Sequence, residues 1–184
     1  TTLQSNLLEK HTPTGREEAW RFTPLKRLGG LHDGTAKVGD RESLSFKGGA
    51  SGVSFERISR ELTTSPAETD DVVIARVREG ARNVATLTIA ANTEVVETIT
   101  LSRSTHGLDS AEFSRVRIEL GAHARATVIM ENTGDAFLAE DVEFALAPGS
   151  NLTFVSLQEW NAGSTHLAKH HAIVDRDATF KSIV

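Results

Sequence analysis

Three histidines near the C-terminal end form the densest group of potential metal ligands in the sequence: His166, His170 and His171. On a helix, His166 and His170 would share one face and could bind a metal ion together. On a strand the same two side chains would also point one way, with His171 on the opposite face. No carboxylate or thiolate stands at a fixed companion spacing, and the His-x-His pair with a downstream Glu that a cupin uses is missing. We therefore expect hydrogen-bonded or solvated histidines at a turn, and no metal site.

A second group of residues with chemical potential consists of four carboxylates that bracket Gly134: Glu131, Asp135, Glu140 and Asp141. Paired carboxylates cleave glycosidic bonds, so this group could be the acid array of a β-helical polysaccharide enzyme. A charge-rich turn between two strands is the simpler interpretation. The alternative function that we retain is a β-helical carbohydrate-active enzyme that uses these turn carboxylates.

Other patterns exclude whole classes of chemistry. The glycine-rich stretch of residues 48–52 lacks the Lys-Ser/Thr of a phosphate loop, so nucleotide binding is not expected. The sequence has no cysteine, which excludes disulfides, thiolate metal ligands and a cysteine nucleophile in this chain. We assign no catalytic, cofactor-binding or metal-binding residue and expect a protein that is not an enzyme.

Composition places the chain among ordinary globular proteins. Its 184 residues can bury a sizeable core in one domain, and a net charge of -5 provides no basic field for nucleic acid. No stretch approaches the length of a membrane span, and no basic segment followed by an apolar run marks secretion. We expect no nucleic-acid or membrane partner, and a cytoplasmic location.

The dominant pattern is a strand–turn–strand unit that occurs three times between Val116 and Val184. Residues 118–129 align with residues 144–155 at a shift of 26 without gaps, and residues 172–184 follow at a shift of 28. A fixed period built from short strands and turns is typical of a stacked repeat. Each copy has one apolar face that it cannot cover alone, so stacking successive copies is expected to bury it.

Stacking the copies aligns apolar residues into three expected inward columns, with Ile89 as an earlier, degenerate member of the first at a shift of 31. The columns are Leu120, Leu146 and Val174; Ala126, Leu152 and Phe180; and Ile129, Val155 and Ile183. This pattern predicts a parallel β-helix, or β-solenoid. An antiparallel sandwich or barrel is the rival, because strands at this spacing also describe those folds.

The part before the repeat is predicted to be a helical and irregular segment over residues 1–71, followed by the β-helix over residues 72–184. Leu3, Leu7 and Leu8 share one helical face, Thr14 and Glu17 have the spacing of a capping box, and Thr23-Pro24 begins a short helix that ends at Gly29-Gly30. Trp20 and Phe22 are expected to pin this segment to the body of the protein.

Two further elements are predicted around the boundary between these parts. The spacing of Phe55, Ile58 and Leu62 suits one face of a short helix, and a polar connector spans residues 63–71. From Val72-Val73-Ile74 onward, β-branched residues predict strands.

The N-terminal stretch Glu17–Leu25, with the sequence EEAWRFTPL, resembles a segment near the start of the SufB/SufD family of iron–sulfur cluster assembly proteins. Residues 166–184, with the spacing His-x-x-x-His-His and an Arg-Asp-Ala core, resemble the middle of actinobacterial-type SufD. The nonapeptide is fairly specific, whereas many β-solenoids share the repeat. The resemblance covers essentially the whole chain, thinly over residues 31–80, and identifies it as the N-terminal part of a SufD-like protein.

The resemblance implies a right-handed parallel β-helix and a non-catalytic scaffold role in the SUF system. The implied partners are a SufB-like subunit and a SufC-like ABC ATPase. The iron–sulfur cluster is assembled transiently by the full complex, so we expect no cofactor in this chain. Because the last copy of the repeat stops at Val184, we expect a piece of a longer protein whose open C-terminal coil self-associates.

Overall fold

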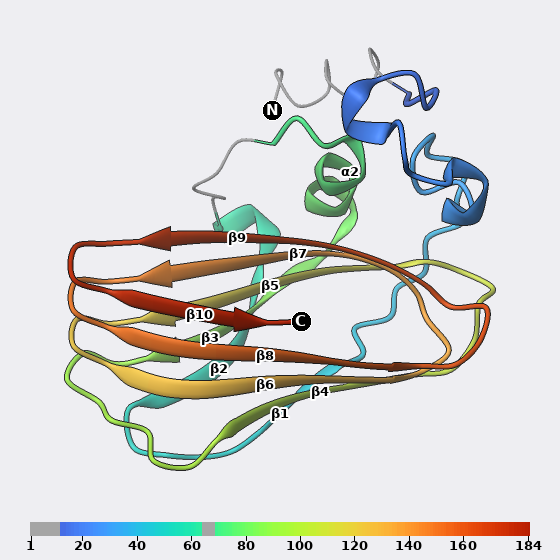
Figure 1. Ribbon diagram of the computed structural model, residues 1–184. Coiled ribbons are helices and arrows are strands. Elements are labelled where there is room, and N and C mark those ends of the chain that lie inside the picture. The colour runs from blue at the N-terminus through green and yellow to red at the C-terminus, as the bar shows by residue number, and fades with distance from the viewer. Residues whose placement is uncertain (1–11, 64–68) are drawn as a thin grey trace.

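The computed structural model describes residues 12–63 and 69–184, and these form a mainly β structure with a few short helices (Figure 1). The helices are η1 (Glu18–Trp20), η2 (Leu25–Leu28), η3 (Arg60–Leu62) and α2 (Val72–Gly80). The strands are β1 (Leu44–Lys47), β2 (Val53–Ser59), β3 (Asn83–Ile89), β4 (Ile99–Thr105), β5 (Glu112–Leu120), β6 (Arg125–Gly134), β7 (Phe137–Leu146), β8 (Asn151–Trp160), β9 (Thr165–Val174) and β10 (Thr179–Ile183). The helical face expected from Leu3, Leu7 and Leu8 lies outside the described residues.

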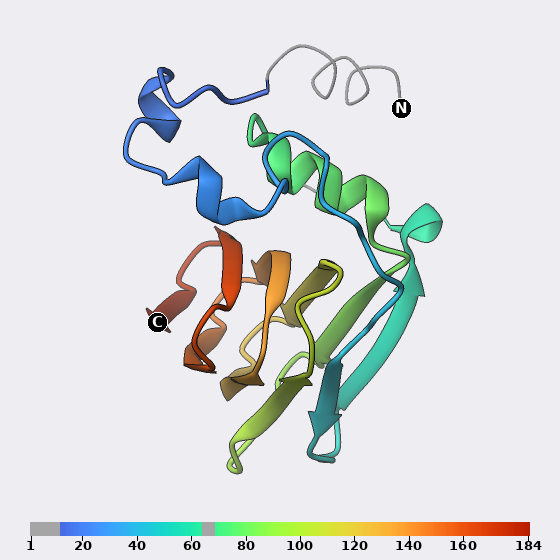
Figure 2. The same cartoon turned by 90° about the vertical axis from the view of Figure 1, so that its right-hand side faces the viewer.

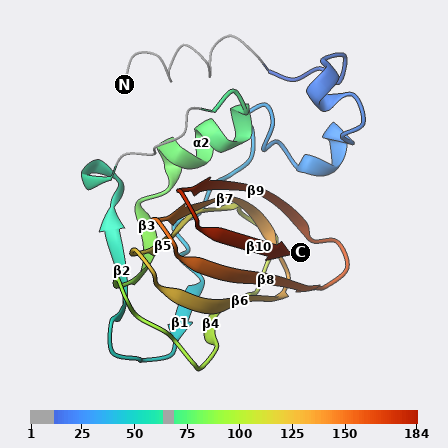
Figure 3. The same ribbon diagram turned by 60° about the vertical axis from the view of Figure 1, so that its left-hand side comes forward.

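The strands build two five-stranded sheets, one in the order β1-β4-β6-β8-β10 and the other in the order β2-β3-β5-β7-β9. From β3 onward the chain alternates between the two sheets, and every strand pairs in parallel with the strand two positions along the sequence. The chain therefore winds as a parallel β-helix, which confirms the predicted fold and excludes the antiparallel sandwich. Figure 3 shows β9 and β10 of the last coil in front of the earlier coils.

Antiparallel strands begin both sheets. β1 pairs with β4, and β2 pairs with β3, each in antiparallel register. The residues before the repeat therefore contribute one strand to each sheet. The glycine-rich stretch of residues 48–52 connects these two strands, which belong to different sheets.

The tight turns that follow β3, β5, β7 and β9 have the same backbone conformation in each coil of the β-helix. Positive φ angles occur at equivalent positions, namely 58° at Asn92, 59° at His123, 70° at Gly149 and 59° at Asp177. Backbone bonds connect successive turns, with Asn92 donating to Ala122 at 2.8 Å and His123 donating to Pro148 at 3.0 Å. Asn and Asp tolerate left-handed backbone better than most residues, which fits their presence at these turns.

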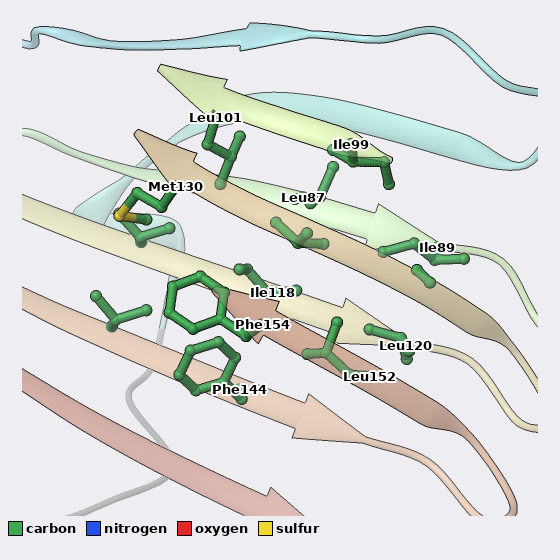
Figure 4. Close-up of a cluster of buried hydrophobic side chains, with 14 of the residues drawn as sticks. Leu87, Ile89, Ile99, Leu101, Ile118, Leu120, Met130, Phe144, Leu152 and Phe154 are labelled. Carbon is green, nitrogen blue, oxygen red and sulfur yellow. The ribbon is translucent and has the colours of Figure 1, made fainter. Parts of the chain in front are cut away.

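The core consists of apolar columns inside the coil (Figure 4). The register confirms two of the predicted columns: Leu120 pairs with Leu146 and then Val174, while Ala126 pairs with Leu152 and then Phe180. The first two members of each column are buried, whereas Val174 in the last coil is 44% exposed and Phe180 is half-buried. The degenerate copy also holds, since Ile89 pairs with Leu120. Burial of these side chains supplies most of the driving force for stacking, at roughly 25 cal/mol for each Å² of apolar surface removed from water.

The third predicted column lies in register but on the wrong face. Ile129 pairs with Val155 and Val155 with Ile183, yet Ile129 and Val155 are only half-buried and Ile183 is 45% exposed. Side chains alternate between the two faces of a strand, so a residue three positions after the inward Ala126 must point outward. The inward column is instead Val128 and Phe154, both fully buried.

A second, smaller core fixes α2 and the N-terminal segment to the outer face of the β2-β3-β5-β7-β9 sheet (Figure 2). Asp71 caps α2, because its Oδ1 accepts hydrogen bonds from the amides of Val73 at 2.9 Å and Ile74 at 3.2 Å. Trp20 packs against this core as predicted, whereas Phe22 is 91% exposed, so its predicted anchoring role is wrong.

Two elements near the start of the repeat differ from the prediction. In the helix predicted from Phe55 to Leu62, only Arg60–Leu62 are helical, as the 3₁₀ helix η3. Residues 53–59 form strand β2, because Val53 and Phe55 alternate with exposed residues and pair with Ile89 and Leu87. Residues 72–74 begin helix α2 and not a strand, since the Asp71 cap and tertiary packing override the β-branched propensity.

The short helices before β1 agree better with the sequence. The helix after Thr23-Pro24 is the 3₁₀ helix η2, and Gly29 ends it with a φ of 55°. Half of the predicted capping box is present, since the Thr14 amide donates to Glu17 Oε2 at 3.0 Å. Glu17 itself is the N-cap of η1, so Thr14 lies ahead of the helix.

Replacing Gly134 by alanine is expected to lower the free energy of unfolding by about 2 kcal/mol or more. Gly134 has a φ of 92°, and an added Cβ would overlap the backbone oxygen of Thr105 in the preceding coil. Gly49→Ala is the matched control, because no atom lies within 4 Å of its added Cβ. Urea unfolding of both variants checks this prediction. Equal midpoints for the two variants would contradict the close approach of Gly134 to Thr105 of the preceding coil.

Candidate functional site

Inside the coil, the inward residues at the start of β6 and β8 are apolar, whereas those near the end of these strands are polar. Arg103 pairs with Asn132, and Asn132 pairs with Gln158, so β4, β6 and β8 place these residues in one column, whose last member, Gln158, is exposed. Arg103 is 1% exposed and Asn132 is fully buried. Such a column is costly unless each polar group finds a partner, so its hydrogen bonds define the site.

Arg103 joins this column to the facing sheet. Its Nη1 lies 3.0 Å from Asn132 Oδ1 and 2.8 Å from Glu140 Oε2, and its Nη2 donates to Ser114 Oγ at 2.8 Å. Glu140 on β7 is 1% exposed. A guanidinium and a carboxylate that are both removed from water stabilise the fold only while they remain paired.

His166 on β9 extends the network to the rim of the last coil. Its Nε2 lies 2.9 Å from Glu140 Oε1, and its Nδ1 lies 3.0 Å from Gln158 Oε1. The indole N–H of Trp160 donates to Gln158 Oε1 at 2.7 Å, and the Gln158 amide donates to Ser156 Oγ at 2.7 Å. We call Arg103, Asn132, Glu140, Gln158 and His166 the interior polar network.

The charge on Glu140 is set by its partners. Burial by itself would raise the pKa of this carboxyl group, but Arg103 and His166 outweigh burial and lower the pKa to about 2. Glu140 is therefore ionised across the physiological range, and it acts only as a hydrogen-bond acceptor. The network holds a buried ion pair inside the coil and connects it to the last coil through His166.

A second polar cluster lies on the outer face of the same sheet, beneath α2. Arg78 of α2 donates from Nε to Asp141 Oδ2 at 2.6 Å and from Nη2 to Glu143 Oε1 at 3.3 Å. Arg117 on β5 also binds Glu143, with Nη2 lying 2.9 Å from Oε2. The side chains of Arg78, Asp141 and Glu143 are at most 4% exposed. These ion pairs fix α2 over β7.

Replacing Arg78 by methionine is expected to loosen α2 and to lower the free energy of unfolding by about 3 kcal/mol, because the carboxylates of Asp141 and Glu143 would lose a buried partner. Hydrogen exchange at the amides of α2 should accelerate. Arg82→Met is the matched control, since Arg82 pairs with Asp40 where both side chains are mostly exposed, at 65% and 76%. Unchanged exchange in the Arg78 variant would show that the ion pairs do not hold α2.

The structure separates the three histidines. His166 and His170 point into the coil and His171 faces the opposite way, as expected for a strand, but all three lie within β9 and not at a turn. His170 packs edge-on against Phe144 and Phe154, with ring centroids 5.8 and 5.6 Å apart. Burial lowers the pKa of His170. Within residues 12–63 and 69–184, no group of three His, Cys, Asp or Glu side chains is arranged to hold a metal ion.

The four acidic residues do not converge on one site, and three of them (Glu131, Glu140 and Asp141) lie in strands and not in a turn. Glu131 is exposed on the outer face of β6, and Asp135 accepts a hydrogen bond from Asn161 in the loops between strands. Glu140 points into the coil, whereas Asp141 points to α2. These four residues therefore do not form the acid array that the alternative enzyme function requires.

The sequence interpretation missed most of the interior polar network. It did not identify Arg103, Asn132 and Gln158, nor Ser114, which binds Arg103. A polar residue nevertheless recurs in successive copies, because Gln158 follows Asn132 at the repeat shift of 26. Extending the repeat back by 29 residues to Arg103 would have revealed the column. The signal was a polar residue at an inward position in successive copies.

The matches to known proteins fit this architecture. Residues 100–184 match the protein family described as "SUF system FeS cluster assembly, SufBD core domain". The chain is 29% identical over 173 residues to an iron–sulfur cluster assembly SufBD family protein of Mycobacterium tuberculosis, covering 93% of this chain and 43% of that protein. A protein of the same description from Mycobacterium leprae is 29% identical over 174 residues, with coverage of 93% and 44%.

The chain spans less than half the length of these curated relatives. None of the helices among the described residues is long and apolar enough to cross a membrane. Residues 100–184 are therefore similar to the SufBD core domain, and 93% of the chain is similar to mycobacterial proteins described as iron–sulfur cluster assembly SufBD family proteins.

Proposed function

We propose that this chain is part of a non-catalytic, SufD-like scaffold subunit that acts in the cytoplasm during iron–sulfur cluster assembly. The observation that carries the proposal is the SufBD core domain match over residues 100–184, which covers nearly all of β4 and every strand from β5 to β10. The family relatives support a role in cluster assembly. The nascent cluster is the cargo of the complex in this proposal, and not a resident cofactor of the chain.

The partners in this proposal are a SufB-like subunit and a SufC-like ABC ATPase. Strands β9 and β10 terminate their sheets, so one backbone edge of each has no strand partner among the described residues. Such edges recruit further strands through main-chain hydrogen bonds. Ile173, Val174 and Ile183 lie on these two strands and are between 43% and 45% exposed, so apolar contacts would add to the pairing.

Co-purification tests this assignment. The full-length protein, tagged and expressed together with SufB-like and SufC-like proteins of the same organism, is expected to retain both through size-exclusion chromatography. A full-length protein that binds neither would refute the assignment.

Self-association through the same edges is the expected behaviour of the chain by itself. Light scattering over a wide concentration range should give a mass above 19.9 kDa that rises with concentration. A proline in β10, for example Ser182→Pro, is expected to reduce the association because proline cannot donate to a new ladder. A strictly monomeric mass at every concentration would contradict pairing through these edges.

A further inference from the structure

Both ring nitrogens of His166 face oxygen acceptors. Nε2 lies 2.9 Å from Glu140 Oε1, and Nδ1 lies 3.0 Å from Gln158 Oε1. The orientation of the Gln158 amide is fixed by Trp160, because an indole N–H only donates and it lies 2.7 Å from the same Oε1. A neutral imidazole carries a single N–H and can donate to one of the two acceptors, whereas an imidazolium donates to both.

We propose that His166 forms a protonation-dependent link between the two sheets in the last coil of the β-helix. We call this link, from Glu140 through His166 to Gln158, the brace. As an imidazolium, His166 joins Glu140 to Gln158, and so connects the sheet that contains β7 and β9 to the sheet that contains β8. When His166 loses a proton, the remaining proton stays on Nε2, because the ionised Glu140 can only accept. The bond to Gln158 is then lost and the bond to Glu140 is kept.

The indole of Trp160 changes partner in the same step. Its N–H lies 2.7 Å from Gln158 Oε1 and 3.3 Å from His166 Nδ1. In the imidazolium state Nδ1 carries a proton, so the indole N–H has Gln158 as its acceptor. In the neutral state the Nδ1 lone pair becomes a second acceptor for the same N–H. Trp160 therefore reports whether the brace is formed.

Charged and titratable groups surround His166 on several elements. The carboxylate of Glu140 on β7 lies 2.9 Å from His166, the guanidinium of Arg103 on β4 lies beyond Glu140, and His170 lies four residues along the same strand. His166 is one of the residues that line a groove, together with Asp70, Asp71 and Lys169. The side chain of His166 is 11% exposed, so its proton can exchange with solvent without unfolding of the coil.

The consequence is a rim whose cross-sheet connection depends on pH. Strand β9 (Thr165–Val174) is the last strand of its sheet among the described residues, and His166 is the second residue of this strand. In acid the connection between the sheets gains a charge-assisted hydrogen bond, which is stronger than a neutral one. In alkali the side chains of Gln158 and Trp160 are held only to each other and to Ser156 and His166 by neutral bonds.

The test is a pH titration followed by NMR. The chain has two tryptophans, so a spectrum of the indole N–H groups contains two signals, and Trp20→Phe assigns them. The Trp160 signal is expected to move sigmoidally with pH, with the same midpoint as the Cε1–H signal of His166. A Trp160 signal that stays constant while the His166 signal moves, or that moves with a different midpoint, would overturn the proposal.

Three variants separate the brace from general effects of pH. His166→Gln should abolish the movement of the Trp160 signal, whereas His171→Gln, which changes an outward histidine on the same strand, should preserve it. In Gln158→Leu the midpoint of the His166 signal should fall by about one pH unit, which is about tenfold in proton affinity. An unchanged midpoint in Gln158→Leu would show that Gln158 does not bind the imidazolium. Circular dichroism confirms that each variant retains the β-helix.

Discussion

Replacing Glu140 by leucine is expected to lower the free energy of unfolding by about 3–5 kcal/mol, and replacing Arg103 by methionine should have a similar effect. Each substitution removes the oppositely charged partner of a buried side chain, since the two side chains lie 2.8 Å apart and are at most 1% exposed. The double variant should recover most of the loss, because it removes both charges together. Urea unfolding of the four proteins gives the coupling free energy.

The control for this cycle is Arg176→Met, which makes the same substitution in an exposed ion pair. Arg176 and Asp177 lie 3.4 Å apart, with side chains that are 85% and 80% exposed, so unfolding should be nearly unchanged. If the double variant lost as much stability as the sum of the single variants, the two charges would not act as a pair.

The same pair predicts how stability depends on pH. The pKa of Glu140 is lowered in the folded state from 4.5 to about 2, so its contribution is fully present above pH 4.5 and disappears as the pH falls towards 2. The lost contribution is about 3 kcal/mol, from roughly 1.4 kcal/mol for each pKa unit. The unfolding free energy of the wild type, measured relative to that of the double variant, should fall by that amount between pH 7 and pH 2.

The second large effect is expected at Phe154. Phe154→Ala should lower the free energy of unfolding by about 3–5 kcal/mol, because it empties the centre of the core. Phe154 is fully buried, and its ring meets that of Phe144 edge-on at a centroid distance of 4.8 Å. Calorimetry or urea unfolding measures the loss.

The neighbouring residue provides the control. Val155 follows Phe154 on β8 but lies on the outer face, half-buried. Val155→Ala should therefore cost about 1 kcal/mol or less. If the alanine variants at the two positions were equally destabilised, the assignment of inward and outward faces would be wrong.

The repeat made most of the β-helix predictable. A shift of 26 aligned residues 118–129 with residues 144–155, and the observed register has the same shift, with Leu120 opposite Leu146 and Ala126 opposite Leu152. When successive coils contain the same number of residues, residues that lie one repeat apart in the sequence become register partners in adjacent strands. The register therefore follows from the period, and needs no knowledge of tertiary contacts.

The face of each strand was less predictable, because sequence alignment of copies preserves register whichever way the side chains point. Ile129 and Val155 are apolar and aligned, yet they lie outside, since alternation from Ala126 and Leu152 assigns them to the outer face. An exposed apolar residue on a strand is common, so hydrophobicity alone did not identify the core. The parity within each strand was the missing criterion.

The interior polar network was missed for the opposite reason. Arg103 and Glu140 are charged, and charged residues in a sequence usually indicate a solvated face. Their burial depends on each other and on His166 across two sheets, which no local pattern encodes. Helix α2 was missed similarly, because its nine residues form a helix on account of the Asp71 cap and the ion pairs of Arg78.

A designed disulfide tests the stacking of coils most directly. The chain has no cysteine, so Ile129→Cys combined with Val155→Cys creates its sole pair of thiols, on the outer face at register partners. Partners in adjacent strands lie about 5 Å apart, within reach of a disulfide. Mass spectrometry of the oxidised, unreduced digest should find these two positions cross-linked within one chain. Failure to cross-link, or equal cross-linking of Ile129→Cys with Ser156→Cys on the opposite face, would contradict the β-helix.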